Sequence, residues 1–303
     1  MASSEFPLYK ILREDFPALL AEIPGKPKQL FVRGRLPWQA GSSGAKSERY
    51  RFLCGVGSRA ATPYGMRACQ SLIAGLAGAP IVIVSGLALG LDAVAHEAAL
   101  SAGLPTIAVL PSGLADSALY PSAHRGLAQN ILLAGGALVS EYEMCELAAK
   151  WTFPSRNRIM AGLTHATLIA EAGEQSGTLI TARLALDFNR DVLCIPHPID
   201  YEKGAGGNRL IREGAALVRH ADDILYALGL RREPALGGTL HKKELPADLS
   251  DNERKIYQAL PEPRTRDELI EMAALDAQAA HIAVTVLLIR GLLIERRGKI
   301  ERA

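Results

Sequence analysis

Between residues 50 and 230, short uninterrupted runs of hydrophobic residues alternate with helical patterns. The runs are rich in Val, Ile and Leu and fall at Arg51–Val56, Ile81–Val84, Thr106–Leu110, Ala137–Ser140, Ala166–Ala170 and Asp191–Ile195. Helix-like segments separate them at Tyr64–Ala77, Leu91–Ala102, Ser122–Ala134, Arg156–Leu163 and Thr178–Phe188. A strand-like piece at Ala216–Val218 and a short helix at Asp222–Leu228 follow. This alternation predicts right-handed crossovers between parallel strands that are covered on both faces, in a doubly wound α/β domain over residues 50–230.

The lead-in before this domain, residues 1–49, has a weaker pattern. Leu8 to Ile23 has helical spacing of apolar residues, interrupted at Pro17, and Leu30–Val32 is typical of a short strand. Residues 41–44 read Gly-Ser-Ser-Gly and predict a flexible loop.

The end of the chain predicts a linker followed by a small module. Residues 231–248 contain Arg, Pro and Gly clusters that are typical of a linker. Residues 249–303 predict helices at Asn252–Leu260, from Thr265 onward and at Ala277–Arg290, then strands at residues 291–295 and 299–301. Ser250 is expected to cap the first helix, and Thr265 with Glu268 fits a capping box for the second. This order of elements is that of a winged helix.

Composition places the chain among ordinary soluble proteins and says little about its partners. Of its 303 residues 49% are hydrophobic and 22% charged, and the net charge is +2. A DNA-binding protein needs a local basic patch rather than a basic total, so this charge neither requires nor excludes nucleic acid. No apolar run reaches the ~18 residues that span a bilayer, and the N-terminus does not resemble a secretory signal. We therefore expect a cytoplasmic protein that does not contact the membrane.

The cysteines do not indicate a metal site. Cys54, Cys69, Cys145 and Cys194 include no Cys-x-x-Cys pair. Because Cys54 and Cys194 lie inside apolar strands, we expect them to be buried free thiols.

The first predicted strand ends in a glycine turn beside an arginine. Residues 55–60, Gly-Val-Gly-Ser-Arg-Ala, loosely fit the G-x-G-x-x-G/A fingerprint of dinucleotide sites. Such a site also needs a carboxylate after the second strand, which here ends Val84-Ser85-Gly86, so we expect no nicotinamide and no other cofactor. The turn is either a plain strand-to-helix connection with a surface arginine, or a phosphate site that contains Gly57, Ser58 and Arg59.

Two further loops join strands to helices with small residues. In the loop at residues 85–92, the backbone of Ser85 and Gly86 is expected to face an anion, while Asp92 and His96 fit a structural hydrogen-bonded pair better than a catalytic one. In the other loop, Ser176, Gly177 and Thr178 either cap the next helix or bind phosphate with its free N–H groups. All three loops follow the carboxyl ends of parallel strands, so we expect them to converge at one edge of the sheet. This edge is where open α/β sheets bind their ligands.

A fourth segment combines cations with aromatic residues. It spans residues 150–158 and contains Lys150, Trp151, Phe153, Arg156 and Arg158. Bases can stack on an aromatic ring while cations neutralise the backbone, and such stacking contributes ~1–3 kcal/mol per base. The alternative is a solvated basic helix start with its aromatic residues in the core.

Together these motifs resemble those of the DprA/Smf family of bacterial DNA-processing proteins. The resemblance covers residues 28–230 and depends on five segments: Gly57-Ser58-Arg59, Ser85–Ala88, Thr106–Leu110, Phe153–Gly162 and Ser176–Ala182. It implies an extended Rossmann fold, a homodimer and no enzymatic activity. It further implies binding of single-stranded DNA during natural transformation, protection of incoming DNA and loading of the RecA recombinase.

By position, the resemblance assigns roles to individual residues. Arg59 and Lys150 would contact the DNA backbone, and Phe153 would lie against a base. The remaining phosphate-binding candidates are Gly57, Ser58, Ser85, Gly86, Arg156, Arg158, Ser176, Gly177 and Thr178. The chain departs from the family pattern at residues 142–147, at His124 and at His197, which stands where Pro-Gly is usual.

Two other functions are compatible with an anion pocket in a Rossmann core. One is a nucleotide phosphoribohydrolase of the lysine-decarboxylase-like type, although the loop Glu174–Leu179 lacks the paired glycines and the glutamate of that class. The other is a sensor of small nucleotides. In the C-terminal module, the helix Ala277–Arg290 has no cation before Arg290, so we predict that this module is not the principal DNA site.

Overall fold

The computed structural model describes residues 6–37, 50–230, 249–260, 264–273, 275–290, 292–296 and 298–302. The chain forms two compact units, Met1–Glu233 and Pro234–Ala303. The predicted loop at residues 41–44 and the predicted linker at residues 231–248 lie outside the described residues.

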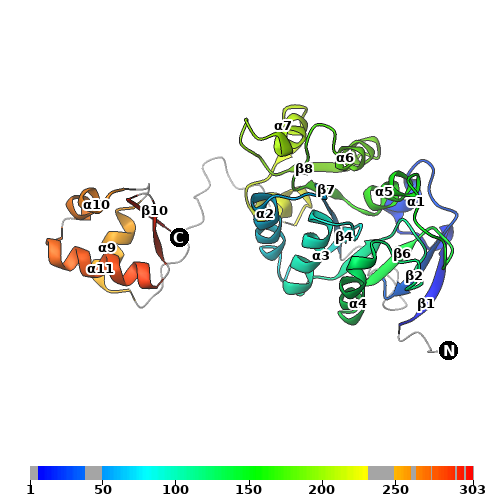
Figure 1. Ribbon diagram of the computed structural model, residues 1–303, viewed down its shortest axis with the longest axis horizontal. Helices are drawn as coiled ribbons and strands as arrows, with labels where there is room; N and C mark the ends of the chain where they lie inside the picture. The colour runs from blue at the N-terminus through cyan, green and yellow to red at the C-terminus, as the bar shows by residue number, and fades with distance from the viewer. Residues whose placement is uncertain are drawn as a thin grey trace. The chain divides into compact units, whose positions relative to one another are not determined.

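Nine strands of the described chain form one sheet in the first unit (Figure 1). Their bounds are β1 Leu8–Leu12, β2 Gln29–Gly34, β3 Arg51–Val56, β4 Ile81–Ser85, β5 Thr106–Val109, β6 Ala137–Ser140, β7 Ala166–Ile169, β8 Asp191–Cys194 and β9 Ala216–Leu217. The order is β1-β2-β6-β5-β4-β3-β7-β8-β9, parallel from β6 to β9 and antiparallel at β1 and β2. The chain runs outward from β3 to β6 and then returns to β7 on the other side of β3. The strand order therefore reverses between β3 and β7, where open α/β sheets bind ligands.

Helices cover both faces of this sheet. The helices of the first unit are α1 Ala18–Glu22, α2 Pro63–Ala74, α3 Leu91–Ser101, α4 Arg125–Leu133, α5 Thr152–Leu163, α6 Thr178–Asp187, α7 Ala205–Arg212 and α8 Ala221–Ala227, with 3₁₀ turns at Arg13–Asp15, Ser122–His124 and Glu202–Gly204. Side chains of α1, α5, α6 and α7 pack on one face in a single hydrophobic cluster. Those of α2, α3 and α8 pack on the other face, where α4 covers the end of the sheet nearest β6. The doubly wound α/β fold predicted from the sequence is confirmed.

The predicted strands of the domain agree with the structure because burial on both faces leaves a clear signal. Each residue of β4, β5, β6 and β7 is buried. Helix α5 was predicted to begin at Arg156 but begins at Thr152. The Thr152 hydroxyl donates to the carbonyl oxygen of Ala149 at 2.8 Å and accepts from its N–H at 3.1 Å, which supports the earlier start. Pro154 is tolerated there because N–H groups in the first turn have no helical partner.

The lead-in is part of the sheet, so the helix expected from the apolar spacing over Leu8–Ile23 is wrong for its first half. Residues Leu8–Leu12 form an edge strand that pairs with β2, which in turn pairs with β6. Leu8, Ile11 and Leu12 have helical spacing, but only Ile11 of the three is buried. Strand pairing outweighs the local pattern here, and the predicted helix is confirmed only after Pro17, in α1.

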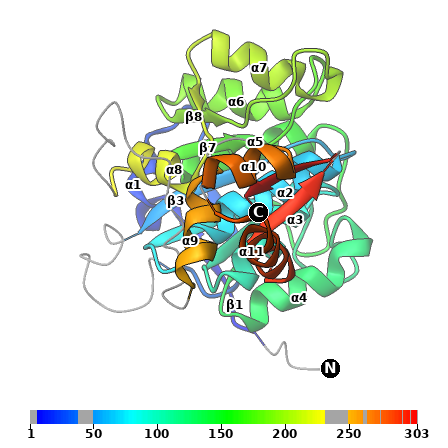
Figure 2. The ribbon, with the colours of Figure 1, turned by 90° about the vertical axis from the view of Figure 1, so that its left-hand side faces the viewer.

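The second unit has the predicted order of elements (Figure 2). It contains α9 Asp251–Gln258, α10 Arg266–Ala273, α11 Ala277–Ile289, β10 Leu293–Arg296 and β11 Lys299–Arg302. Ser250 and Glu253 form a capping box at α9, and Thr265 and Glu268 exchange the same two bonds at α10. Its assignment as a winged helix stays a prediction. Within the described residues no single helix is long and apolar enough to cross a membrane; α10 and α11 taken together, across a bend of 116°, meet that test by length and composition.

Candidate nucleic-acid interface

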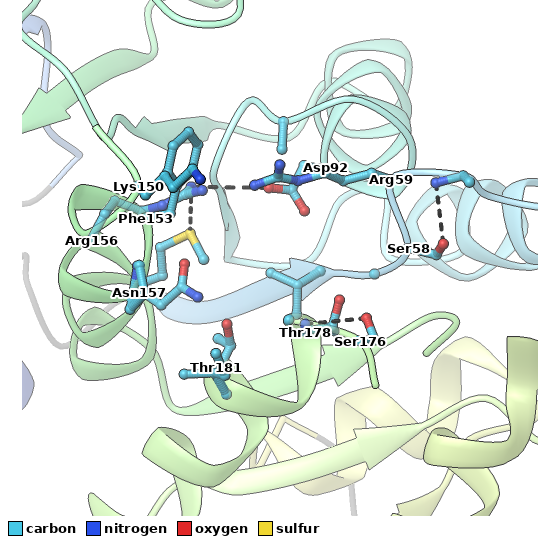
Figure 3. A pocket seen from close by; sticks show the side chains of 18 of the residues that line it. Ser58, Arg59, Asp92, Lys150, Phe153, Arg156, Asn157, Ser176, Thr178 and Thr181 are labelled. Atoms are coloured by element: carbon cyan, nitrogen blue, oxygen red, sulfur yellow. Dashed lines mark hydrogen bonds and ion pairs between the residues drawn. The ribbon is translucent and has the colours of Figure 1, made fainter. Parts of the chain in front are cut away.

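A cavity of about 770 Å³ lies at the point where the strand order reverses (Figure 3). Its walls come from the loop after β3, the start of α3, the segment that leads into α5, and the first turns of α6. The polar and aromatic side chains that line it are Ser58, Arg59, Asp92, Tyr120, Lys150, Phe153, Arg156, Asn157, Ser176, Thr178 and Thr181. Segments far apart in the sequence meet here because carboxyl ends of parallel strands share one edge.

The loop after β3 is held close to the start of α3. A Cβ on Gly57 would lie 2.3 Å from the Leu91 side chain, so this position needs glycine. The Ser58 N–H donates to the carbonyl oxygen of Glu171 at 2.8 Å, and its hydroxyl accepts from the Ala60 N–H at 3.2 Å. Arg59 is exposed, and its guanidinium carbon lies 5.0 Å from the centre of the Phe153 ring. The loop therefore offers an exposed cation rather than a row of free N–H groups.

The first turn of α6 supplies another part of the wall. The Ser176 hydroxyl accepts from the Thr178 N–H at 3.2 Å, so Ser176 shields one of the N–H groups expected to bind phosphate. The Gly177 N–H has no acceptor among the described residues. Capping and anion binding are thus compatible here, because a helix start has several N–H groups without helical partners.

The segment around α5 brings in the aromatic ring and a second cation. Phe153 is partly buried, with the Tyr120 ring edge-on to it at 5.5 Å between centroids. Lys150 is exposed at the cavity. Trp151 is 63% exposed, which corrects the alternative that placed the aromatic residues of this segment in the core.

Arg156 lines the cavity but is not a free cation. Its side chain is 4% exposed, and one guanidinium nitrogen donates to the carbonyl oxygen of Val109 at 2.9 Å. The same nitrogen lies 3.1 Å from the sulfur of Met160 and 4.0 Å from the carboxylate of Asp92. Burial lowers its pKa, and the charge of Asp92 acts in the opposite direction.

Three of the expected phosphate ligands, Ser85, Gly86 and Arg158, do not line this cavity. The buried Ser85 hydroxyl donates to the carbonyl oxygen of Gly55 at 2.6 Å. The Gly86 N–H donates to Asp92 at 3.2 Å, and Gly86 lines a small adjacent cavity of about 30 Å³. Arg158 pairs with Glu141 at 2.5 Å. Each of these groups already has a protein partner.

Asp92 and His96 do not pair with each other, contrary to the prediction. Asp92 accepts from the backbone of the loop after β4, and burial raises its pKa, while Arg156 and these hydrogen bonds act against that shift. His96 lies against the Thr106 hydroxyl at 2.7 Å, and burial lowers its pKa to about 3. Both are structural groups with separate partners.

Three side chains that line the cavity were not among the expected site residues: Tyr120, Asn157 and Thr181. Asn157 lies four residues after Phe153 and Thr181 three residues after Thr178, so the helical period could have found both. Tyr120 lies in a long loop that has no periodic signal. Cys54 and Cys194 are buried free thiols as predicted, and within the described ranges no group of three His, Cys, Asp or Glu side chains could hold a metal ion.

Comparison with known proteins shows the family of this chain. The family described as DNA recombination-mediator protein A matches residues 8–229. The chain belongs to this family. It is 38% identical over 234 residues to protein Smf of Synechocystis, a match that covers 77% of this chain and 56% of that protein. The chain thus spans little more than half the length of that relative.

Two solved DprA structures support the assignment of the fold. The structure from Streptococcus pneumoniae has a TM-score of 0.64 and 39% identity, and the match covers 73% of this chain and 74% of that one. The structure from Helicobacter pylori has a TM-score of 0.63 and 28% identity, with 74% and 97% covered. That study describes the single-stranded DNA binding mode of the Helicobacter protein.

Proposed function

We propose that the chain binds single-stranded DNA in the cavity between β3 and β7, as a recombination mediator in DNA processing. The observation that carries the proposal is that Arg59, Lys150, Phe153 and the start of α6 line one cavity. Cations and a helix start suit phosphates, and an aromatic ring suits an unpaired base. The single-stranded DNA binding mode described for the Helicobacter relative supports the same class of ligand.

In this proposal the phosphate contacts are Gly57, Ser58, Arg59, Lys150, Ser176, Gly177 and Thr178, and Phe153 stacks on a base. Because the Arg59 guanidinium lies over the Phe153 ring, a base can reach that face only when Arg59 moves away. A base within a duplex is already stacked on its neighbours, so single strands should bind more tightly than duplex. The contacts carry no base-reading pattern, which makes the binding tolerant of sequence.

The wider role that we propose follows the family resemblance. The chain would act as a homodimer in natural transformation, protect incoming DNA and load RecA onto it. Protection is tested by the survival of a labelled oligonucleotide during nuclease digestion, and loading by the rate at which RecA assembles on an oligonucleotide that carries the bound chain. Faster digestion, or slower RecA assembly, would contradict these roles.

We propose binding without catalysis. The carboxylate in the cavity, Asp92, is buried and engaged by the backbone and Arg156, so it is poorly placed to activate water. The deciding experiment is a competition assay in which a fluorescent single strand is displaced by unlabelled single strand, duplex or a nucleoside monophosphate, with chromatography for released base. Displacement by duplex as efficient as by single strand would contradict the proposal. Tight binding of the monophosphate would favour a nucleotide sensor, and released base would favour a phosphoribohydrolase.

A further inference from the structure

The guanidinium of Arg156 occupies a space that the fold keeps open for it. A Cβ on Gly86 would lie 1.4 Å from one guanidinium nitrogen and 2.2 Å from the guanidinium carbon. Gly86 does not have a positive φ, so its backbone conformation does not require glycine. The three atoms nearest to that Cβ all belong to Arg156. Residue 86 therefore has to be glycine because any side chain would collide with the guanidinium of Arg156.

Asp92 extends this contact to the loop after β4. Its carboxylate accepts from the Gly86 N–H at 3.2 Å and lies 4.0 Å from the Arg156 guanidinium, with 7% of the Asp92 side chain exposed. A buried cation without a partner is strongly unfavourable, and so is a buried carboxylate. Each of the two charges thus compensates the other, which explains an acidic side chain at the wall of an anion pocket.

The loop after β4 in turn holds the loop that carries Arg59. The Leu91 N–H donates to the carbonyl oxygen of Ser58 at 3.2 Å. A Cβ on Gly90 would lie 2.3 Å from that oxygen, so the two loops touch through their backbones. A continuous series of contacts therefore runs from Arg156 on α5, through Asp92, to Ser58 and Arg59. Because Phe153 lies one helical turn before Arg156, this series of contacts connects Phe153, on α5, to Arg59, on the loop after β3.

We propose that Arg156 and Asp92 are positioning residues that fix Phe153 relative to Arg59, and that Arg156 makes no phosphate contact. The inference rests on the proposed binding of single-stranded DNA at this cavity. It predicts that loss of Arg156 weakens DNA binding without changing its dependence on salt. It also predicts that Gly86, which lies outside the main cavity, is as important for binding as Arg156.

The first experiment measures the affinity of the full chain for a fluorescent oligothymidine over a salt series. Arg156→Gln should weaken binding about fivefold or more and leave the slope of log affinity against log salt unchanged, whereas loss of a phosphate contact would reduce that slope by about 0.7. Arg156→Lys keeps the charge but not the planar fork, so it should weaken binding to a similar degree. The inference would be overturned if Arg156→Gln reduced the slope or left the affinity unchanged, or if Arg156→Lys bound DNA as tightly as the native chain.

The second experiment is a double-mutant cycle with Gly86→Ala and Arg156→Leu, where Leu is too short to reach residue 86. Gly86→Ala should weaken binding about fivefold in the native background and by less than about twofold in the Arg156→Leu background, since the clash is then absent. Gly126→Ala in α4 is the control, because a Cβ there meets nothing within 4 Å. Equal effects of Gly86→Ala in both backgrounds would overturn the inference.

Thermal unfolding of the same variants separates this inference from the proposed function. Gly86→Ala should lower Tm in the native background and leave it unchanged in the Arg156→Leu background, and this readout needs no DNA. If the native chain fails to bind oligothymidine, the proposed function fails, while the unfolding cycle still decides whether Gly86 and Arg156 are coupled. An unfolding cycle without coupling would overturn the positioning role even where DNA binding is strong.

Discussion

The salt dependence of DNA binding tests how the roles are divided among Arg59, Lys150 and Phe153. Arg59 and Lys150 line the cavity, and neither forms an ion pair within the described part of the chain. Two cations that replace counterions on a single strand give a slope of about −1.4 in log affinity against log salt. Binding should therefore weaken about sevenfold between roughly 50 and 200 mM salt. Arg59→Ala or Lys150→Ala should halve the slope, so that the same change in salt weakens binding about 2.6-fold.

Phe153→Ala should behave differently because stacking releases no counterion. The slope should stay near about −1.4, while the affinity falls by part of the ~1–3 kcal/mol that a stacked base contributes. In the free protein, Arg59 lies 5.0 Å from the centre of the Phe153 ring, a contact of about 0.5–1 kcal/mol that binding must break. Removal of Phe153 also removes that cost. Phe153→Ala should therefore weaken binding about two- to fivefold more in the Arg59→Ala background than in the native one.

Fluorescence anisotropy of a labelled oligothymidine, titrated over a series of salt concentrations, measures all of these quantities. Arg183→Ala is a matched control, since Arg183 is an exposed arginine of α6 that pairs with Asp187 at 3.3 Å and does not line the cavity. Three variants that changed the slope alike would refute the division of roles. A Phe153 effect that is equal in both backgrounds would show that the base does not displace Arg59 from the ring.

Three further predictions concern stability, the second unit and the thiols. Burial lowers the pKa of His96 to about 3 and, with the charges of Arg51 and Arg190, lowers that of His165 to about 4, so both are neutral in the folded chain while their unfolded value is 6.5. As pH falls below 6.5, only the unfolded chain takes up these protons, so the folded chain becomes less stable. For His96, the free energy of unfolding in urea should fall by about 2 kcal/mol between about pH 8 and pH 5, with a smaller loss for His165. His96→Gln should abolish the part of this loss that is due to His96. A chain truncated after Leu230 should keep its affinity for single-stranded DNA, since residues 241–303 carry eleven basic and eleven acidic residues; a loss of about a hundredfold would place the main DNA site in the second unit. A thiol reagent should label the exposed Cys145 in the native chain, and only after unfolding the buried Cys54, Cys69 and Cys194.

The fold was predictable because its strongest signals are local. Strands buried on both faces leave uninterrupted apolar runs, and β3 to β8 each lie at a predicted run. The edge strand β1 was not predictable from its own residues. Leu8, Ile11 and Leu12 fit a helical period, and their conformation is decided by pairing with β2, a contact more than fifteen residues away in sequence.

The site was predictable at the level of loops and not of single side chains. The convergence of the loops follows from topology, since parallel strands present their carboxyl ends at one edge. On α5, Phe153 and Asn157 are four residues apart and both line the cavity, while Arg158 lies beside Glu141. Lys150, Arg156 and Arg158 were all expected to bind phosphate, because the burial and ion pairs that set Arg156 and Arg158 apart depend on tertiary contacts.

A single cavity of this kind is small, and the proposed homodimer would supply two of them. It offers two unpaired cations and one aromatic ring within the described residues, while a third cation, Arg156, is buried against Asp92. Two phosphate contacts and one stacked base give a modest affinity that falls further at physiological salt. A homodimer would present two such cavities to the same strand, so that binding at the first raises the effective concentration at the second. Sequence-tolerant retention of a long single strand can then arise from two small sites that act on the same strand.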